Sequence, residues 1–265
     1  MSRFLPGRAG VGTLIGMVHL GPVLDGATRL ADVVARAIAD AEALAEAGFD
    51  AICAENFGDA PFYPGRVPAH TVAGMTRALL AVRAVTERAG IPLGVNVLRN
   101  DCDTALAIAA AVDAAFVRVN VHTGAMVTDQ GLIEGRAHET VRWRDRMAPD
   151  VAIYADVQVK HAAPLAPRPL DEEAREVFGR GRADALIVSG ARTGGKTDVA
   201  RLEAVRAAVS EAPILVGSGA TPDDVKALLR VADGVIVGSW LKEGGQVLRP
   251  VDPARARAFV AAARG

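Results

Sequence analysis

The chain has 265 residues, of which 51% are hydrophobic, so it is long enough to bury a substantial core. Its 30 Lys and Arg residues balance 31 Asp and Glu, and no basic run is interleaved with aromatic residues, which argues against a nucleic-acid partner. Cys53 and Cys102 form no metal-ligand spacing and are too few for a disulfide scaffold, so we interpret them as buried apolar residues.

The chain begins without a recognisable targeting segment. No apolar stretch of signal-peptide length is followed by a cleavage signal, and nowhere do 18 apolar residues stand in a row. We therefore expect a soluble, cytoplasmic protein, and peripheral contact with a membrane stays open.

Short β-rich runs alternate along the chain with longer stretches of helical periodicity. Strands are predicted at residues 13–19, 49–55, 92–97, 114–121, 151–159, 184–189, 213–217 and 233–238. Helices are predicted at residues 30–48, 70–90, 104–112, 202–212, 222–233 and 253–264. Eightfold strand-helix alternation in about 250 residues is typical of a (β/α)8 barrel, and a doubly wound open sheet is the second choice. No GxGxxG motif follows the first strand and no linker divides the chain, so we predict one barrel domain over residues 1–265.

Two of the predicted strands carry apolar side chains on one face and chemically reactive side chains on the other. In the fourth strand, Arg118 and Asn120 alternate with valines. In the fifth, Asp156, Gln158 and Lys160 share one parity. Charged groups are rarely placed inside a fold unless they are paired, hydrated or bound to a ligand. We therefore expect a single pocket that receives Glu55, Arg118, Asn120, Asp156 and Gln158.

Polar candidates gather at the carboxyl ends of the predicted strands, where (β/α)8 barrels carry their active sites. The amino ends of the same strands carry almost nothing comparable. The candidate catalytic residues are His19, Glu55, His122, Asp156 and Lys160. The candidate substrate-binding residues are Asn56, Asn96, Asn100, Arg118, Asn120, His161 and Ser189.

Structural roles stay open for several of these residues. His19 precedes a Gly-Pro turn and could cap a loop, and Asn100 could belong to a tight turn before a helix. Arg118 and Asp156 could form a buried structural pair across neighbouring strands, which would lower the pKa of the acid.

Glycine-rich turns follow the last three predicted strands. Glycine lets backbone N–H groups approach an anion closely, and a helix N-terminus adds a partial positive charge. The loops after strands seven and eight of such barrels commonly hold a phosphate. Residues 190–197 also match the P-loop pattern, but that motif belongs to the first strand of an open sheet, so we interpret the match as chance. The expected phosphate-binding residues are Gly194, Gly217, Ser218, Gly219, Gly238 and Ser239.

A series of uninterrupted motifs resembles the BtpA family. The resemblance extends from about Leu14 to about Asp252 and is carried, in order, by IGMVHLGP, AENFGDAPF, GVNVLRND, FVRVNVHTGA, TDQGLIEG, DVQVKHAAPL, ALIVSG, LVGSGAT and ADGVIVGSWLK. It implies a barrel similar to the ribulose-phosphate-binding class, in a family whose founding cyanobacterial member is associated with photosystem I biogenesis. After Pro22 the chain reads VLDGATRL where the family tends to have a Pro-Gly-Ser stretch, which affects any substrate contact made by this loop.

Two hypotheses for function compete. The first is an enzyme that acts on a small phosphorylated compound by acid/base chemistry, as an isomerase, lyase or aldolase, with no built-in cofactor. A Schiff base on Lys160, or a divalent metal held by Glu55, His19, His122 and Asp156, is a minor alternative within it. The second, implied by the resemblance, is a non-catalytic assembly or stability factor for a membrane protein complex such as photosystem I. The convergent polar groups favour the enzyme, and we expect a homo-oligomer.

Overall fold

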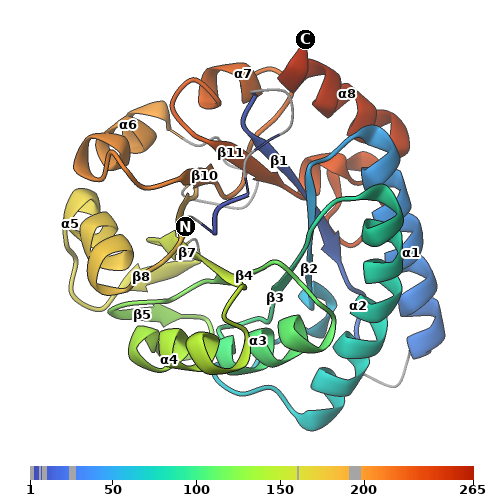
Figure 1. Cartoon of the computed structure of the whole chain (residues 1–265), viewed down its shortest axis with the longest axis horizontal. Helices are drawn as coiled ribbons and strands as arrows, with labels where there is room; N and C mark the ends of the chain where they lie inside the picture. The colour runs from blue at the N-terminus through green and yellow to red at the C-terminus, as the bar shows by residue number, and fades with distance from the viewer. Residues whose placement is uncertain (1–2, 6, 8–10, 24–27, 160, 191–197) are drawn as a thin grey trace.

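Eight parallel strands close into a barrel surrounded by helices (Figure 1). The computed structural model describes residues 3–5, 7, 11–23, 28–159, 161–190 and 198–265. The barrel strands are β1 (Thr13–His19), β2 (Ala51–Glu55), β3 (Leu93–Asn96), β4 (Phe116–Val119), β7 (Ala152–Val157), β9 (Ala185–Val188), β10 (Ile214–Val216) and β11 (Gly234–Val237). Around the barrel they neighbour one another in the order β1-β11-β10-β9-β7-β4-β3-β2. The (β/α)8 architecture predicted from the sequence is therefore confirmed.

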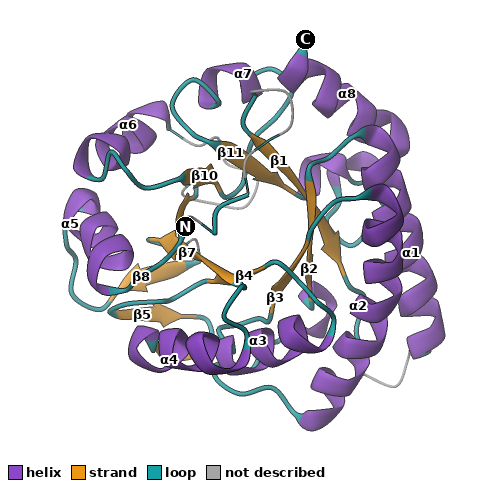
Figure 2. Ribbon diagram, viewed as in Figure 1, coloured by secondary structure: helices purple, strands orange, loops and turns teal. Residues whose placement is uncertain are grey.

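The helices lie outside the barrel, as the purple elements of Figure 2 show. They are α1 (Leu30–Ala47), α2 (Ala69–Ala89), α3 (Cys102–Ala111), α4 (Ala137–Met147), α5 (Leu170–Arg175), α6 (Val199–Ala208), α7 (Val225–Leu228) and α8 (Pro253–Arg264). A π-helical turn at Glu176–Arg180 continues α5. The helix α7 is much shorter than the predicted 222–233, because residues 229–233 continue as hydrogen-bonded turns.

Alternate residues of each strand fill the barrel, and the others pack against the helices. Phe116 and Tyr154 belong to the interior cluster, and their rings stack with centroids 4.7 Å apart. Val117 and Val119 belong to the outer cluster, which includes residues of the surrounding helices. Gly94 leaves space for the Phe116 ring, since a Cβ at this position would lie 2.1 Å from it. The predicted strand register, with the valines outside, is confirmed.

Apolar residues close the amino ends of the strands. The backbone N–H of Leu5 donates to the Tyr154 hydroxyl at 3.1 Å, and the Thr13 hydroxyl donates to the Leu5 carbonyl at 2.6 Å. The Phe4 ring lies 5.9 Å from the Tyr154 ring, centroid to centroid. In Figure 1 the N-terminal segment accordingly lies across the barrel axis. Asp50, Asp184 and Asp233 also lie at this end, where each carboxylate accepts from a backbone N–H of a neighbouring strand.

Both cysteines are free and buried. Cys53 packs among the interior side chains of the barrel, and burial raises the pKa of its thiol. Burial likewise raises the pKa of Cys102 to about 12. Both thiols therefore stay neutral, in agreement with their interpretation as apolar residues.

A small antiparallel sheet beside β4 and β7 was not predicted from the sequence. It consists of β5 (Ala125–Thr128), β6 (Gly131–Glu134) and β8 (Ala162–Pro164), in the order β6-β5-β8 (Figure 2). Val121, Met126, Ile133 and Val159 form its own apolar cluster. Of the residues in these three strands only Met126 and Ile133 are buried, so no apolar run marks them in the sequence as one marks the equally short strands of the barrel.

The boundaries of the eight barrel strands differ from the predicted ones by no more than two residues at either end. One domain over residues 1–265 stays a prediction. Within the part of the chain that the structure describes, no helix combines the length and the apolar character needed to cross a bilayer.

Candidate active site

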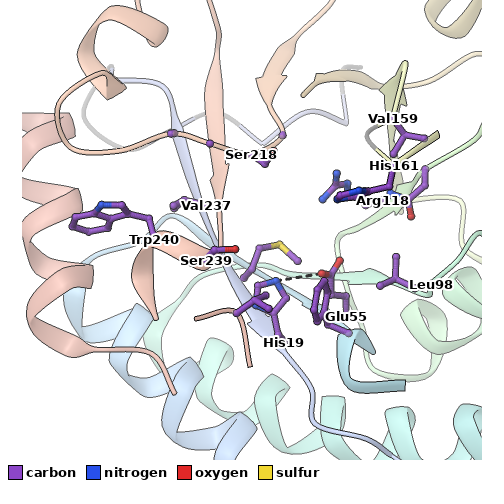
Figure 3. A pocket seen from close by; sticks show the side chains of 18 of the residues that line it. His19, Glu55, Leu98, Arg118, Val159, His161, Ser218, Val237, Ser239 and Trp240 are labelled. Atoms are coloured by element: carbon purple, nitrogen blue, oxygen red, sulfur yellow. Dashed lines mark ion pairs between the residues drawn. The ribbon is translucent and has the colours of Figure 1, made fainter. Parts of the chain in front are cut away.

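A cavity of about 350 Å³ opens at the carboxyl ends of the barrel strands, a volume typical of small-molecule sites. His19 from β1, Glu55 from β2 and Arg118 from β4 line one part of it (Figure 3). The turns after β10 and β11, at 217–221 and 238–240, line another part. The apolar portion of the wall consists of Met17, Phe57, Phe62, Leu98, Val159, Val237 and Val247.

His19 and Glu55 form a buried pair in this cavity. Nε2 of His19 lies 3.2 Å from Oε1 of Glu55, and the amide of Asn96 donates to Oε2 at 2.9 Å. Burial lowers the pKa of His19 below its usual value, and the hydrogen bond and charge of Glu55 only partly oppose this. The other ring nitrogen, Nδ1, is buried and has no hydrogen-bond partner among the described residues, which fits an unprotonated atom. His19 is therefore neutral near pH 7 and donates from Nε2 to Glu55.

Arg118 and Asp156 form a second buried pair, between β4 and β7. Nε and Nη2 of Arg118 each donate to a different oxygen of Asp156 at 2.9 Å. Asn120 donates to the same carboxylate at 3.1 Å, and Ser189 donates at 3.3 Å. Burial alone would lower the pKa of Arg118, but the charge and hydrogen bonds of Asp156 raise it above its usual value. Arg118 and Asn120 line the cavity. Asp156, which accepts from both of them and from Ser189, does not line it and instead lines a second, smaller crevice together with Gln158.

The two glycine turns present unused backbone donors. Within the described residues, no acceptor is found for the backbone N–H groups of Gly219, Ala220, Gly238 and Ser239. Gly219 has φ 84°, a conformation that favours glycine. The N–H of Gly217, by contrast, donates to the Val188 carbonyl at 2.9 Å, so this residue lines the wall without a free donor. Unpaired N–H groups in a cavity attract an anion.

The β11 turn lies directly against the acid/base pair. A Cβ at Gly238 would lie 2.7 Å from Cε1 of His19. The absence of a side chain at Gly238 therefore brings the anion-attracting turn beside the histidine. In Figure 3, Ser239 lies on the same side of the cavity as His19.

Two predicted substrate-binding residues instead hold loops together. The side-chain oxygen of Asn56 accepts from the Leu98 N–H at 2.7 Å. Asn100 exchanges two hydrogen bonds, both 2.8 Å, with the backbone of Val121. Neither asparagine lines the main cavity. The turn interpretation that was left open for Asn100 agrees with this placement, whereas His161 lies on the cavity wall as predicted.

Strand parity predicted that Gln158 enters one pocket with Glu55 and Arg118, and this prediction is wrong, because Gln158 does not line the main cavity. His122 does not line it either. His122 Nε2 lies 2.8 Å from the Gly181 carbonyl, and burial lowers the pKa of this histidine. Gln158 has φ 53° and hydrogen bonds to Arg168 and Arg201. Both residues lie beyond the ends of β4 and β7, where the alternation of a strand no longer sets the direction of a side chain. They line a side crevice next to the small sheet.

Three sequence predictions concern residues that the structure does not describe. Lys160, Gly194 and the P-loop-like residues at 191–197 lie outside the described residues. The described ranges contain no group of three or more His, Cys, Asp or Glu side chains placed to hold a metal ion. The alternative metal site at Glu55, His19, His122 and Asp156 therefore has no support from the geometry.

Sequence reasoning missed several residues that line the cavity. Phe57, Phe62, Asp129, Trp240 and Arg255 all contribute to its wall. The two phenylalanines form an edge-to-face pair, with centroids 6.2 Å apart. The motif AENFGDAPF contained both of them, but nothing local indicated that they turn toward the mouth. Asp129 lies on the hairpin between β5 and β6, and Trp240 and Arg255 lie in the chain after β11. Folding, rather than proximity in sequence, brings these three residues to the cavity.

The fold and the site define a class of protein, the closed (β/α)8 barrels with a cavity at the carboxyl ends of their strands. A sequence profile of the BtpA family matches residues 11–265, so the chain belongs to this family, as its motifs predicted. It is 46% identical over 252 residues to "Photosystem I biogenesis protein BtpA" of Synechocystis sp., covering 94% of this chain and 87% of the relative.

Solved structures of other proteins share the fold. Tryptophan synthase from M. tuberculosis superposes with a TM-score of 0.61 and 19% identity, covering 96% of this chain and 94% of that one. Thiamine phosphate pyrophosphorylase from Pyrococcus furiosus gives a TM-score of 0.58 and 17% identity, with 95% of each chain covered. At such identities the likeness establishes the fold alone.

Proposed function

We propose that the protein is an enzyme that binds a small phosphorylated compound and moves protons on it, in the manner of an isomerase, lyase or aldolase. The observation that carries the proposal is the presence, in one cavity, of the His19–Glu55 pair and of two turns with unused backbone N–H groups. The first supplies a proton donor and acceptor, and the second supplies an anion site.

Glu55 and His19 are suited to act as one proton-transfer unit. The neutral imidazole carries a proton on Nε2. This N–H donates a hydrogen bond to Oε1 of Glu55, with the two heavy atoms 3.2 Å apart. Asn96 fixes the carboxylate through its second oxygen at 2.9 Å. When a carbon acid lies above the pair, Glu55 takes its proton and returns it to a neighbouring atom, while His19 hydrogen-bonds to the carboxylate. Such chemistry needs a buried, oriented pair and no redox cofactor.

The phosphate of the substrate occupies the turns at 217–221 and 238–240 in this proposal. Gly219, Ala220, Gly238 and Ser239 offer N–H groups with no acceptor among the described residues. The close approach of Gly238 to His19 supports an anion site beside the proton-transfer pair. A phosphate held there directs the adjoining carbon atoms of a small metabolite toward Glu55.

The relative from Synechocystis is named for photosystem I biogenesis, and this name favours a second candidate function. In it, the protein is a non-catalytic assembly or stability factor for a membrane protein complex. A buried His–Glu pair on a cavity is costly to build without a ligand, so we rank the enzyme first. We further propose that the protein works in the cytoplasm, as a homo-oligomer, without a bound cofactor or nucleic acid.

The experiment is proton exchange in D₂O. The purified protein is incubated with a panel of phosphorylated metabolites, and mass spectrometry follows deuterium incorporation and turnover. We expect exchange on at least one compound, and a loss of about 10²-fold or more in His19→Gln and Glu55→Gln. His138→Gln is the matched control, because the His138 side chain is 69% exposed. Exchange that persists in both cavity variants would contradict the assignment of the pair.

A further inference from the structure

Arg255 lies on the wall of the cavity near the two glycine turns. It belongs to the first turn of α8, whose N-cap is Asp252. Its Nε donates to the Trp240 carbonyl at 2.6 Å, and its guanidinium carbon lies 4.3 Å from the centre of the Trp240 ring. The carbonyl and the ring therefore orient the guanidinium plane before any ligand arrives.

No acid of the described residues forms an ion pair with Arg255. Among the described residues, no carboxylate oxygen lies within 4.0 Å of its side-chain nitrogens. Nη1 and Nη2 have no hydrogen-bond acceptor there either, because the side chain bonds only through Nε. Arg118 in the same cavity differs, because its Nε and Nη2 both donate to the Asp156 carboxylate. Glu55 and Asp129 are the acids among the described residues that line the cavity, and neither is the partner of the printed side-chain bond of Arg255, which goes to the Trp240 carbonyl.

We propose that Arg255 binds the phosphate group of the substrate and is its main side-chain ligand. This inference rests on the proposed function, since it uses the same anion site. The neutral N–H groups of Gly219, Ala220, Gly238 and Ser239 surround the anion, and Arg255 supplies the positive charge that they lack. Its two terminal nitrogens present parallel donors, which match two phosphate oxygens.

The experiment measures the binding of inorganic phosphate through Trp240. The chain has two tryptophans, and Trp143→Phe leaves Trp240, stacked on Arg255, as the single reporter. Trp143 lies on α4 and is 38% exposed, so its replacement leaves the cavity unchanged. Phosphate titration is followed by fluorescence in this background and by calorimetry in the otherwise unaltered chain.

We expect Arg255→Gln to weaken phosphate binding by about 10- to 100-fold, the usual scale for losing a charge-assisted pair of hydrogen bonds. Arg255→Lys keeps the charge but loses the planar fork, and we expect it to recover part of the affinity. Arg257→Gln is the matched control, because Arg257 is exposed on the same helix and its loss changes net charge equally. We expect its affinity to stay within about twofold of the parent, since exposed charges are screened.

The outcomes separate this inference from the function on which it rests. If Gly219→Val abolishes phosphate binding and Arg255→Gln binds as tightly as the parent, the anion site stands and the role of Arg255 is overturned. Equal weakening in Arg255→Gln and Arg257→Gln also overturns it, because the effect is then one of overall charge. If the parent protein binds no phosphate, the proposed function itself fails. If Arg255→Gln does not fold, the phosphate affinity of Arg255→Lys is compared with that of the parent instead. An unchanged affinity in Arg255→Lys contradicts bidentate binding by Arg255.

Discussion

Replacing Asp156 with Asn tests what the buried pair of β4 and β7 contributes. The two oxygens of Asp156 accept four hydrogen bonds, two of them from Arg118 at 2.9 Å. An amide keeps the shape but has one acceptor oxygen, so its NH₂ group faces a donor. The Arg118 guanidinium is then left buried without its counter-charge. Breaking a buried pair from one side costs about 3–5 kcal/mol, or roughly 6–20 °C in Tm for a chain of this size.

The assay is urea and thermal unfolding followed by circular dichroism. Glu42→Gln is the control, because it makes the same chemical change at the Arg88–Glu42 pair, where the side chains are 65% and 46% exposed, respectively. We expect that variant to lose less than about 1 kcal/mol. An Asp156→Asn protein within about 1 kcal/mol of the parent would refute the reasoning. If Asp156 is instead catalytic, as the sequence predicted, the rate of proton exchange on the substrate falls by about 10²-fold in Asp156→Asn, while its free energy of unfolding stays close to that of the parent.

Three further predictions concern buried histidines and glycines. Burial lowers the pKa of His19 and His122 from the usual 6.5, so below pH 6.5 the unfolded chain binds more protons than the folded one. The free energy of unfolding should therefore fall by up to about 1.4 kcal/mol per pH unit for each histidine as the pH drops below 6.5. Unfolding at pH 7.5 and 5.5 checks this, and an unchanged pH slope in His122→Asn, relative to a control His138→Asn, contradicts it. Gly94→Ala sets a Cβ 2.1 Å from the Phe116 ring, so urea unfolding should show a loss of about 1–3 kcal/mol or more in the free energy of unfolding. The control Gly65→Ala, where nothing lies within 4 Å, should lose less than about 0.5 kcal/mol. Gly238→Ala sets a Cβ 2.7 Å from Cε1 of His19, so proton exchange should drop with little loss of fold, and full activity in this variant argues against His19.

Strand alternation predicted the inner face of the barrel from the sequence. Val117 and Val119 pack outside the barrel, so Arg118 between them lies on the interior side, and Ala51 and Cys53 before Glu55 also belong to the interior. These predictions hold because a strand has a period of two wherever its hydrogen bonds continue. The family motifs predicted the same fold, and the sequence profile confirmed the family.

The limits of that reasoning lie where strands end. His122 and Gln158 follow β4 and β7, and the φ of 53° at Gln158 has no local signal in the sequence. Their side chains therefore turn into a crevice outside the main cavity. Arg255 shows the opposite case, because nothing in the sequence distinguishes it from the other arginines of α8, yet it lines the cavity and its Nε donates to the Trp240 carbonyl. Contacts between residues distant in sequence, rather than periodicity, decide such placements.

The most direct test of the central claim is a crystal structure of the protein grown in inorganic phosphate. The account predicts one phosphate in the cavity, with its oxygens about 2.7–3.2 Å from the backbone nitrogens of Gly219 and Gly238. The anion should also lie within reach of Arg255 and beside the His19–Glu55 pair. Empty turns at saturating phosphate, or an anion bound only elsewhere on the surface, would contradict the account.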